Sequence, residues 1–573
     1  MTTRWIAAAA VAVALGVAVF APIAVPPAER EPDHSLRASV HDAFARRLQA
    51  GSEIVSTYGP WGILQRGDFD PRTRTVALVM SIAIGAAFAI ALVLCARDAG
   101  AGAGVATLIA IAAAALLAGG SDDSRYLGVE FVALMWGGFS TRPPPAGRPL
   151  LGRGRVENPS HILLVALIAV IALIKLSYLV VALFVLAAIV CIRRRAVDPA
   201  IFAGTFVAAW MAAGQRIAGL PAFFRTGAEV VAGYADAQAA SRAVTPELVA
   251  ALAGAAGLVI LVAAMERSMV RTAAMAAALF LTMKIAYVRY DDPHAITAAV
   301  LLPFLGVGYV LLRADRSRAM AIAAAVAVGG IIIINGPALL DRLHRREPRL
   351  EPLPPAPAVR GSIDAVPWGS AALLAHHLDY APRPVFESHL AFTPALAELN
   401  ARHFRTKPPM WLWVSAESID GYPPLLADGP SWLEIFSRYD VASRAADHLL
   451  LRRRAAPLPI ERQPLATLRG RAGEEVALPD AGDALLWCSI ETSPSRAERI
   501  KAALVRPTRL TMRLDDQTFV VPAAMARGGF LLPRARRFRL SADFTLHLTA
   551  VRMPGRASGT VPDPSDPRIS LRR

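Results

Sequence analysis

Cysteine is scarce in this chain, which has only 3 cysteines among 573 residues. Cys95, Cys191 and Cys488 have no spacing typical of a zinc site or a disulfide framework, so any extracytoplasmic part must be stabilised by its own core. Common soluble-enzyme motifs are also missing, namely a phosphate-binding glycine-rich loop with Lys-Ser/Thr, HExxH and GxSxG. These absences exclude a disulfide-rich secreted scaffold and argue against a pump that hydrolyses ATP.

Charge is also sparse, and long apolar runs take its place. Only 18% of the residues are charged, 55% are apolar, and the mean hydropathy is +0.43. Uncharged stretches of about 20 residues are long enough to cross a bilayer, which excludes an ordinary cytosolic enzyme and a disordered chain. The sequence therefore predicts a polytopic α-helical membrane protein with about eleven transmembrane helices. The predicted spans are 5–25, 76–96, 101–119, 125–141, 159–175, 177–192, 199–213, 247–265, 271–288, 294–312 and 318–336.

The net charge of +16, from 61 Lys+Arg and 45 Asp+Glu, suggests an acidic partner such as nucleic acid until the positions of the charges are considered. Arginines fall between alternate apolar runs, where the positive-inside rule places the cytoplasm, and acidic pairs such as Asp122-Asp123 mark the opposite segments. This alternation predicts a cytoplasmic N-terminus, an odd number of spans, an extracytoplasmic C-terminal region and no nucleic-acid partner. The predicted cytoplasmic arginines are Arg4, Arg97, Arg142, Arg148, Arg153, Arg155, Arg193, Arg194, Arg195, Arg267, Arg271, Arg313, Arg316 and Arg318.

The first span also has features of a signal peptide, since Arg4 precedes an apolar run. That run of about 20 residues is longer than the usual signal-peptide core, so we interpret it as a retained anchor. Its cleavage would leave the orientation of every later span unchanged.

Three predicted extracytoplasmic segments are large enough to carry chemistry. The first outer loop is 26–75, and the second is the short amphipathic segment 214–246. The third is the C-terminal region from about residue 345, which follows a transmembrane domain that covers 1–344. We expect any reaction on the outer face of the membrane to use residues from these segments.

The C-terminal region divides in two after a Pro-rich linker at 345–359. Residues 360–459 mix helical and strand patterns and predict an α/β region. Short alternating stretches over 460–573 predict a β-rich region, a β-sandwich or jelly roll. Aromatic residues here favour core packing, with carbohydrate binding by stacking as the alternative. They are Trp411, Trp413, Trp432 and Trp487.

The first outer loop carries the most suggestive polar residues. Asp33-His34-Ser35 comes soon after the first span, and the apolar four-residue spacing from Leu36 to Leu48 predicts a helix along the bilayer surface. A carboxylate just above the lipid headgroups is placed to act as general base on an acceptor hydroxyl. Asp33 is therefore the catalytic candidate, and a solvated loop is the alternative interpretation.

Several short motifs together resemble the GT-C superfamily of membrane glycosyltransferases, and more narrowly a group of bacterial multi-pass proteins of that type. The likeness touches most of the chain. The motifs are Asp33-x-Ser35 and Thr57-Tyr58-Gly59-Pro60 in the first loop, Ile174-Lys175-Leu176-Ser177, Trp210 to Gln215 with Gly233-Tyr234, Lys284 to Asp291 with His294, and Arg383-Pro384-Val385-Phe386 followed by Thr393-Pro394.

The resemblance implies an enzyme of the bacterial inner membrane that passes a sugar, with inversion, from a polyprenyl-phosphate donor to a periplasmic acceptor. It implies that Asp33 is the base and that cations at outer span ends bind the lipid phosphate. The implied partners are the lipid-linked sugar donor, membrane lipids, and a glycan, lipid or protein acceptor of the cell envelope. The implied substrate-binding residues are Tyr58, Lys175, Arg216, Lys284, Arg289, Asp291 and His294. Each cation among them is also explained as an interfacial residue whose stem lies in the bilayer.

The chain departs from the family pattern at the acidic positions. His34 stands where better-known GT-C enzymes have a second acid, so their metal-binding acidic pair is not evident. Either the enzyme works without metal, or Asp42, Glu53 or Asp122 completes a site for a divalent metal. Two other functions stay open. One is a transporter or flippase, disfavoured by the few intramembrane charges, and the other is a non-catalytic carbohydrate-binding scaffold.

Overall fold

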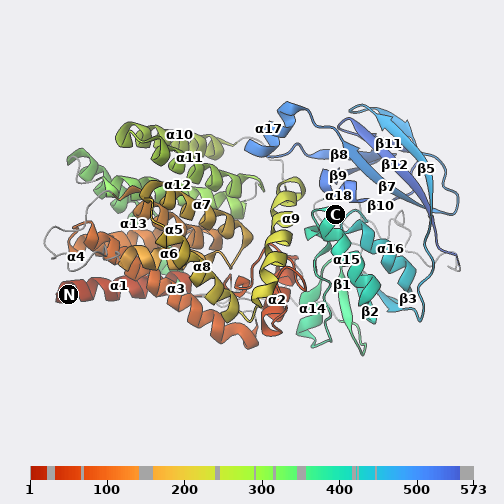
Figure 1. The fold of residues 1–573 in the computed structure, drawn as a ribbon, viewed down its shortest axis with the longest axis horizontal. Coiled ribbons are helices and arrows are strands. Elements are labelled where there is room, and N and C mark those ends of the chain that lie inside the picture. Colours follow the sequence, from red (N-terminus) through yellow and green to blue (C-terminus); the bar gives the residue numbers. More distant parts are fainter. Residues whose placement is uncertain are drawn as a thin grey trace. The chain divides into compact units, whose positions relative to one another are not determined.

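The chain folds as two compact units in this computed structural model (Figure 1). The helical unit comprises Met1–Pro26, Tyr58–Ile217 and Arg242–Arg349. The mixed unit comprises Pro27–Thr57, Ala218–Ser241 and Leu350–Arg573. The structure describes residues 2–21, 32–65, 70–140, 159–238, 245–289, 292–313, 318–344, 356–415, 421–422, 425–445 and 448–554.

Helices make up the helical unit, because a chain in hydrocarbon must satisfy its backbone polar groups within each segment. Short 3₁₀ and π turns, η1 (Gly62–Leu64) and η2 (Met135–Phe139), accompany them. The helices are α1 (Thr3–Phe20), α3 (Pro71–Asp98), α4 (Ala103–Ala118), α5 (Asp122–Leu134), α6 (Pro159–Ile171), α7 (Leu176–Arg193), α8 (Val197–Ala212), α10 (Pro246–Glu266), α11 (Met269–Tyr287), α12 (Asp292–Leu312) and α13 (Arg318–His344).

Helices overlie all the predicted spans, but fewer of them qualify as spans. Within the described residues, 6 helices are long and apolar enough to cross a membrane, or 7 if the bent pair Val197–Ala212 and Ile217–Gln238 is one span. α4 and α6 are shorter apolar helices, and α5 carries Asp123 and Glu130 within its 13 residues. The structure therefore supports a membrane protein with 6 clear spans, and the prediction of about eleven is not supported.

α1 crosses α3 at a pair of glycines. A Cβ added at Gly16 would collide with the carbonyl oxygen of Gly85, and one added at Gly85 would collide with that of Gly16. Small residues let membrane helices approach closely, and such packing drives helix association in lipid. The crossing packs α1 closely against α3, and the interpretation of α1 as a retained anchor stays a prediction.

The mixed unit contains a sheet of order β1-β2-β4-β3, in which only β1 and β2 are parallel, and two antiparallel sheets of order β10-β7-β12-β5 and β6-β11-β8-β9. Its β-rich part is thus the C-terminal one. The strands are β1 (Ile363–Val366), β2 (Trp411–Ser415), β3 (Tyr439–Ala445), β4 (His448–Arg453), β5 (Glu461–Gly470), β6 (Glu475–Ala477), β7 (Leu485–Thr492), β8 (Leu510–Leu514), β9 (Gln517–Val521), β10 (Phe530–Leu532), β11 (Arg537–Leu540) and β12 (Phe544–Arg552). Its helices are α2 (Pro32–Ala45), α9 (Leu220–Gln238), α14 (Ser370–Ala375), α15 (Pro394–Thr406), α16 (Gly429–Arg438), α17 (Arg496–Leu504) and α18 (Ala523–Gly528), with 3₁₀ turns η3 (Ile217–Gly219) at the unit boundary and η4 (Ser388–Leu390).

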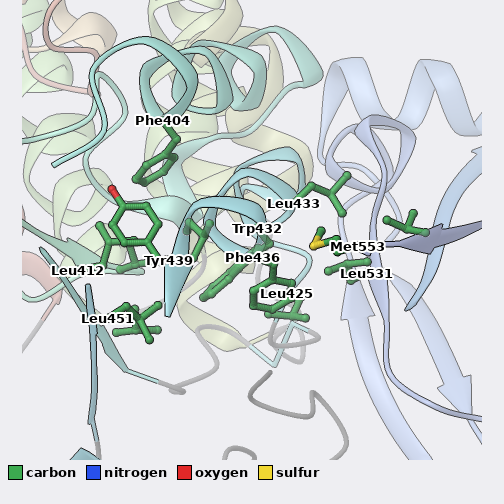
Figure 2. Packing of buried hydrophobic residues seen from close by; sticks show 14 residues of the cluster. Phe404, Leu412, Leu425, Trp432, Leu433, Phe436, Tyr439, Leu451, Leu531 and Met553 are labelled. Atoms are coloured by element: carbon green, nitrogen blue, oxygen red, sulfur yellow. The ribbon is translucent and has the colours of Figure 1, made fainter. Parts of the chain in front are cut away.

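Figure 2 shows the main core of the mixed unit. Phe404 of α15 and Trp432 of α16 pack there with residues of the first sheet. Leu531 of β10 and Met553 join the same cluster, so this core continues into the β-rich region. Trp413 is also buried. Trp413 and Trp432 are therefore core residues, as the sequence analysis favoured.

Parts of the three segments predicted to lie outside the membrane belong to the mixed unit, namely Pro27–Thr57, Ala218–Ser241 and the chain from Leu350, whereas Tyr58 and the rest of the first loop belong to the helical unit. On α2, Ser39 Oγ donates a hydrogen bond to Ser370 Oγ at 2.8 Å. On α9, Glu229 accepts a hydrogen bond from Thr393 Oγ1 at 2.7 Å. These contacts join parts of the first loop and of the 214–246 segment to the C-terminal region, and the side of the membrane assigned to them by charge stays a prediction.

α2 forms where the sequence predicts a helix, but its surroundings differ from the expected bilayer surface. Leu36 and Val40 are buried, as are the polar His34 and Ser39 between and beside them. The backbone oxygen of Ser35 accepts a hydrogen bond from Ser370 Oγ at 2.9 Å. A surface helix would leave its polar face in water, so the prediction that α2 lies along the bilayer surface does not hold.

Candidate functional site

A charged cluster forms at the N-terminus of α5. Lys175 Nζ donates hydrogen bonds to both carboxylate oxygens of Asp123, at 2.8 and 3.1 Å. Tyr178 donates its hydroxyl hydrogen to Asp123 Oδ1 at 2.6 Å, and Gln65 Nε2 donates to the same oxygen at 3.2 Å. One carboxylate thus binds an ammonium, a phenol and an amide, while the Lys175 side chain stays 21% exposed.

Local structure explains why these groups meet. Ser121 caps α5 and accepts a hydrogen bond from the Ser124 amide at 3.2 Å, which leaves Asp123 in the first turn, where the helix dipole favours negative charge. α6 ends at Ile171, and α7 begins at Leu176 with Lys175 as its N-cap. The break expected near Lys175 is therefore present, and a carboxylate partner at the break accounts for the lysine there.

The first-loop motif runs beside this break. Tyr58 and Lys175 form an antiparallel β-bridge, and the Gly59 amide donates to the Ile174 carbonyl at 2.9 Å. A Cβ at Gly59 would collide with the Leu173 carbonyl, so this close approach requires glycine. The Lys175 ammonium lies 5.9 Å from the Tyr58 ring centroid, within cation–π range. Two of the motifs that carry the family resemblance are thus hydrogen-bonded to each other.

Two further motif segments belong to the same neighbourhood. Trp61 Nε1 donates to the Ala209 carbonyl at 2.8 Å, which ties the first-loop motif to the Trp210 segment. His294, near the start of α12, interacts electrostatically with Asp123. The first-loop motif therefore contacts both the Lys175 segment and the chain next to Trp210.

The other predicted cations have separate surroundings. Arg216 is exposed, and its carbonyl accepts a hydrogen bond from Trp210 Nε1 at 2.9 Å. Lys284 is half-buried on α11, with its ammonium 5.7 Å from the Phe280 ring centroid. Arg289 is half-buried just after α11. Lys175, by contrast, has Asp123 as a direct carboxylate partner.

Two of the predicted site residues, Asp33 and Asp291, have side chains outside the described residues. The backbone of Asp33 belongs to α2, but its side chain lies outside the described residues, as does the whole of Asp291. The assignment of Asp33 as general base therefore stays a prediction.

The acids expected to complete a metal site have other partners. Asp42 pairs with Arg46 at 3.0 Å, and Asp122 pairs with Arg125 at 2.7 Å. Glu53 accepts a hydrogen bond from a backbone amide at 2.8 Å. In the part of the chain that the structure describes, no group of three or more His, Cys, Asp or Glu could bind a metal ion.

Sequence reasoning missed three members of the cluster. Asp123 was noticed only as an acidic marker of topology, and Gln65 carried no motif. Tyr178 follows Lys175 by three residues, one helical turn, so the pair of them was a usable signal. No local sequence pattern predicts the contact between Lys175 and Asp123, because this contact joins α5 to the start of α7.

A second buried cluster lies in the mixed unit around another motif residue. Arg383 is fully buried and donates to Asp364 Oδ2 at 2.8 Å, while its Nε lies 3.5 Å from Asp428. Asn400 and Ser431 each donate to Asp428 at 2.8 Å. Burial raises the pKa of Asp428 to about 7, although Arg383 and these donors favour its charged form. This cluster fixes the Arg383 segment inside the protein and exposes none of it to a substrate.

Comparison with family models, with curated proteins and with solved structures finds no match for this chain. The resemblance to GT-C enzymes therefore rests on the sequence motifs alone and stays a prediction.

Proposed function

We propose that the protein is a membrane glycosyltransferase of GT-C type, which transfers a sugar from a polyprenyl-phosphate donor to an extracytoplasmic acceptor. The observation that supports this best is that the Lys175 motif segment pairs with Asp123 and is bridged to the Tyr58 motif segment. An ammonium held by a carboxylate, yet partly exposed, is suited to bind a phosphate because it is positioned before the ligand arrives.

Each residue then has a distinct task. Lys175 binds the donor phosphate as a point charge, and Tyr58 contacts the same ligand beside it. Asp123 orients Lys175 and acts through it, so it is a positioning residue. Asp33 removes the proton of the acceptor hydroxyl as the sugar is transferred with inversion.

The proposal includes a topology. The N-terminus lies in the cytoplasm, the chain crosses the bacterial inner membrane an odd number of times, up to eleven, and the mixed unit is periplasmic. Cys191 is the exposed cysteine, whereas Cys95 and Cys488 are buried. In a Cys191→Ser background, Asp516→Cys should therefore react with a membrane-impermeant maleimide added to intact spheroplasts. Labelling only after lysis would contradict the topology.

Sugar transfer tests the activity. Purified protein in lipid nanodiscs is supplied with a panel of polyprenyl-phosphate sugars and a cell-envelope acceptor extract, and release of polyprenyl phosphate is measured. We expect Asp33→Asn to slow release by about 100-fold or more, because a general base contributes that much. Glu53→Gln, a first-loop acid outside the proposed site, should keep the wild-type rate. Equal rates for Asp33→Asn and wild type would remove the base assignment, and solute flux without transfer would favour a transporter.

A further inference from the structure

An apolar cavity of about 360 Å³ lies inside the helical unit. The residues that line it come from α3, α4, the second half of α5 with η2, α12 and α13, all within that one unit. On α5 the lining begins at Val132 and ends just after η2 at Ser140, whereas Asp123 lies in the first turn of the same helix. The cavity is therefore separate from the ion pair proposed to bind the sugar donor.

The polar groups of the lining gather at the end of the cavity where α3 and α5 finish. Ser140 and the turn Ala99–Ala101 form part of the wall there. Trp136 Nε1 donates to Ser160 Oγ at 3.1 Å, and Ser160 Oγ donates to Asp98 at 3.1 Å, so the ends of the two helices are neighbours. The remaining wall consists mostly of Leu, Ile, Val, Ala and Phe side chains. Apolar cavities stay dry and bind apolar molecules, so the ligand that fits is a hydrocarbon with a polar group at one end.

The cavity has room for a further group, and it is elongated. Outside its own helix, the nearest described atom to a Cβ added at Gly308 would be Met135 Cγ, at 4.0 Å. Along α4 the lining runs from Val105 to Leu116, which spans about 16 Å at 1.5 Å per residue. An apolar cavity of about 150 Å³ is enough to bind benzene, so this larger and longer space fits a hydrocarbon chain.

We propose that the cavity binds one acyl chain of a phospholipid, with the ester end beside Ser140 and the methyl end between α4 and α12. The 6 candidate spans found in the described chain all belong to the helical unit, so acyl chains surround this unit. An empty space between helices loses the dispersion contacts of its walls, and packing of this kind holds membrane helices together. An acyl chain restores these contacts and so stabilises the arrangement of α3, α4, α12 and α13.

A phospholipid fits better than the polyprenyl tail of the sugar donor. The donor phosphate is assigned to Lys175, beside Asp123 at the other end of α5. A tail that starts there would place hydrocarbon against the polar end of the cavity, whereas a phospholipid from the leaflet at that end brings its ester to the polar groups. The proposal goes beyond glycosyl transfer and does not depend on it.

Photocrosslinking tests the occupancy of the cavity. The full chain is placed in phosphatidylethanolamine nanodiscs with a small fraction of a phosphatidylglycerol that carries a diazirine in its acyl chain, and the adducts are mapped by peptide mass spectrometry. We expect saturable adducts at the lining residues Ile109 and Val307. Adducts confined to outward positions such as Leu108, which is 50% exposed, would overturn the proposal.

A matched pair of glycine substitutions on α12 locates the chain. Gly308→Phe fills the cavity, whereas Gly306→Phe lies about 160° away around the helix, where no described atom is within 4 Å of an added Cβ. We expect Gly308→Phe to reduce the Val307 adduct at least about tenfold, since losing the burial of about two methylene groups is worth that much, and Gly306→Phe to keep it.

The melting temperature shows whether each variant is folded, and Ala112→Phe, which enters the same cavity from α4, replaces Gly308→Phe if that variant does not fold. Equal Val307 adducts in the cavity-filling variant and in Gly306→Phe would overturn the proposal. Displacement of the probe by polyprenyl phosphate at a lower concentration than by unlabelled phosphatidylglycerol would overturn it as well, because the cavity would then belong to the donor lipid.

Discussion

The two units bury charge in different ways. In the helical unit, two acids are paired with bases, Asp123 with Lys175 at 2.8 Å and Glu266 with both Arg271 at 2.8 Å and Arg313 at 2.7 Å. The mixed unit instead surrounds one buried arginine, Arg383, with two carboxylates. The helical unit thus offsets these two acids with cations, whereas the Arg383 cluster adds the neutral donors Asn400 and Ser431 to its carboxylates.

Arg383→Leu should cause the largest loss of stability, because it removes the cation of the buried Arg383 cluster in the mixed unit. The substitution leaves Asp364 buried without its cation, which costs about 3–5 kcal/mol in comparable buried pairs. Thermal unfolding of the detergent-solubilised protein, followed by tryptophan fluorescence, measures the loss. Arg513→Gln, at a half-exposed ion pair on β8, is the control and should change stability by less than about 0.5 kcal/mol. Equal losses of stability in the two variants would show that Arg383 does not stabilise the buried carboxylates around it.

Lys175→Met tests the helical-unit pair and should cost less, about 2 kcal/mol, because the lysine is partly exposed. The charge-neutral double variant Lys175→Met with Asp123→Asn should recover part of the loss, since no unpaired charge remains. If the double variant is no more stable than the single one, the pair does not compensate charge in the way described.

The pH dependence of stability follows from the burial of Asp428 in the mixed unit. The pKa of Asp428 is raised by burial to about 7 in the fold and is about 3.9 in an unfolded chain. The folded state therefore binds this proton more tightly, so the free energy of unfolding falls as pH rises from about 4 to about 7, by up to about 1.4 kcal/mol per pH unit. Asp428→Asn should remove that contribution from a melting-temperature profile. An identical profile for the variant would assign the slope to other groups.

Glu130→Gln should change stability least, and it separates unpaired from paired buried charge in the helical unit. Glu130 is 0% exposed on α5, and among the described residues neither of its carboxylate oxygens has a hydrogen-bond partner. Removing an acid that pairs with nothing should leave the melting temperature unchanged or raise it slightly, in contrast to Lys175→Met. A loss comparable to that of Lys175→Met would reveal a partner for Glu130 that the comparison omits.

The sequence predicted what depends on local pattern. Apolar runs located the helices, whereas the grouping of the first loop, the 214–246 segment and the C-terminal region on one side of the membrane stays a prediction, of which the structure shows only that Pro27–Thr57 and Ala218–Ser241 fold with the C-terminal region. The break at Lys175 was predictable because a lysine is costly in the middle of a span. The number of spans was not predictable, since apolar helices such as α4 also occur at lengths below a full crossing.

Contacts between residues that are far apart in the chain could not be predicted from the sequence. Asp123 and Lys175 are 52 residues apart, and nothing in either segment specifies the other. Likewise, the apolar spacing of α2 revealed a helix, but only tertiary packing against Ser370 showed that its polar side is buried too. Such contacts are set by how helices and sheets pack together, which no local pattern encodes.

Binding of a lipid phosphate tests the central claim most directly. The measurement is the affinity of polyprenyl phosphate, without sugar or acceptor, for the full chain in nanodiscs, in wild type and in the charge-neutral variant Lys175→Gln with Asp123→Asn. The account predicts saturable binding to wild type and a loss of at least about tenfold in the variant, because the point charge for the phosphate is gone. Equal affinity of both proteins, with the variant folded by its melting temperature, would contradict the account.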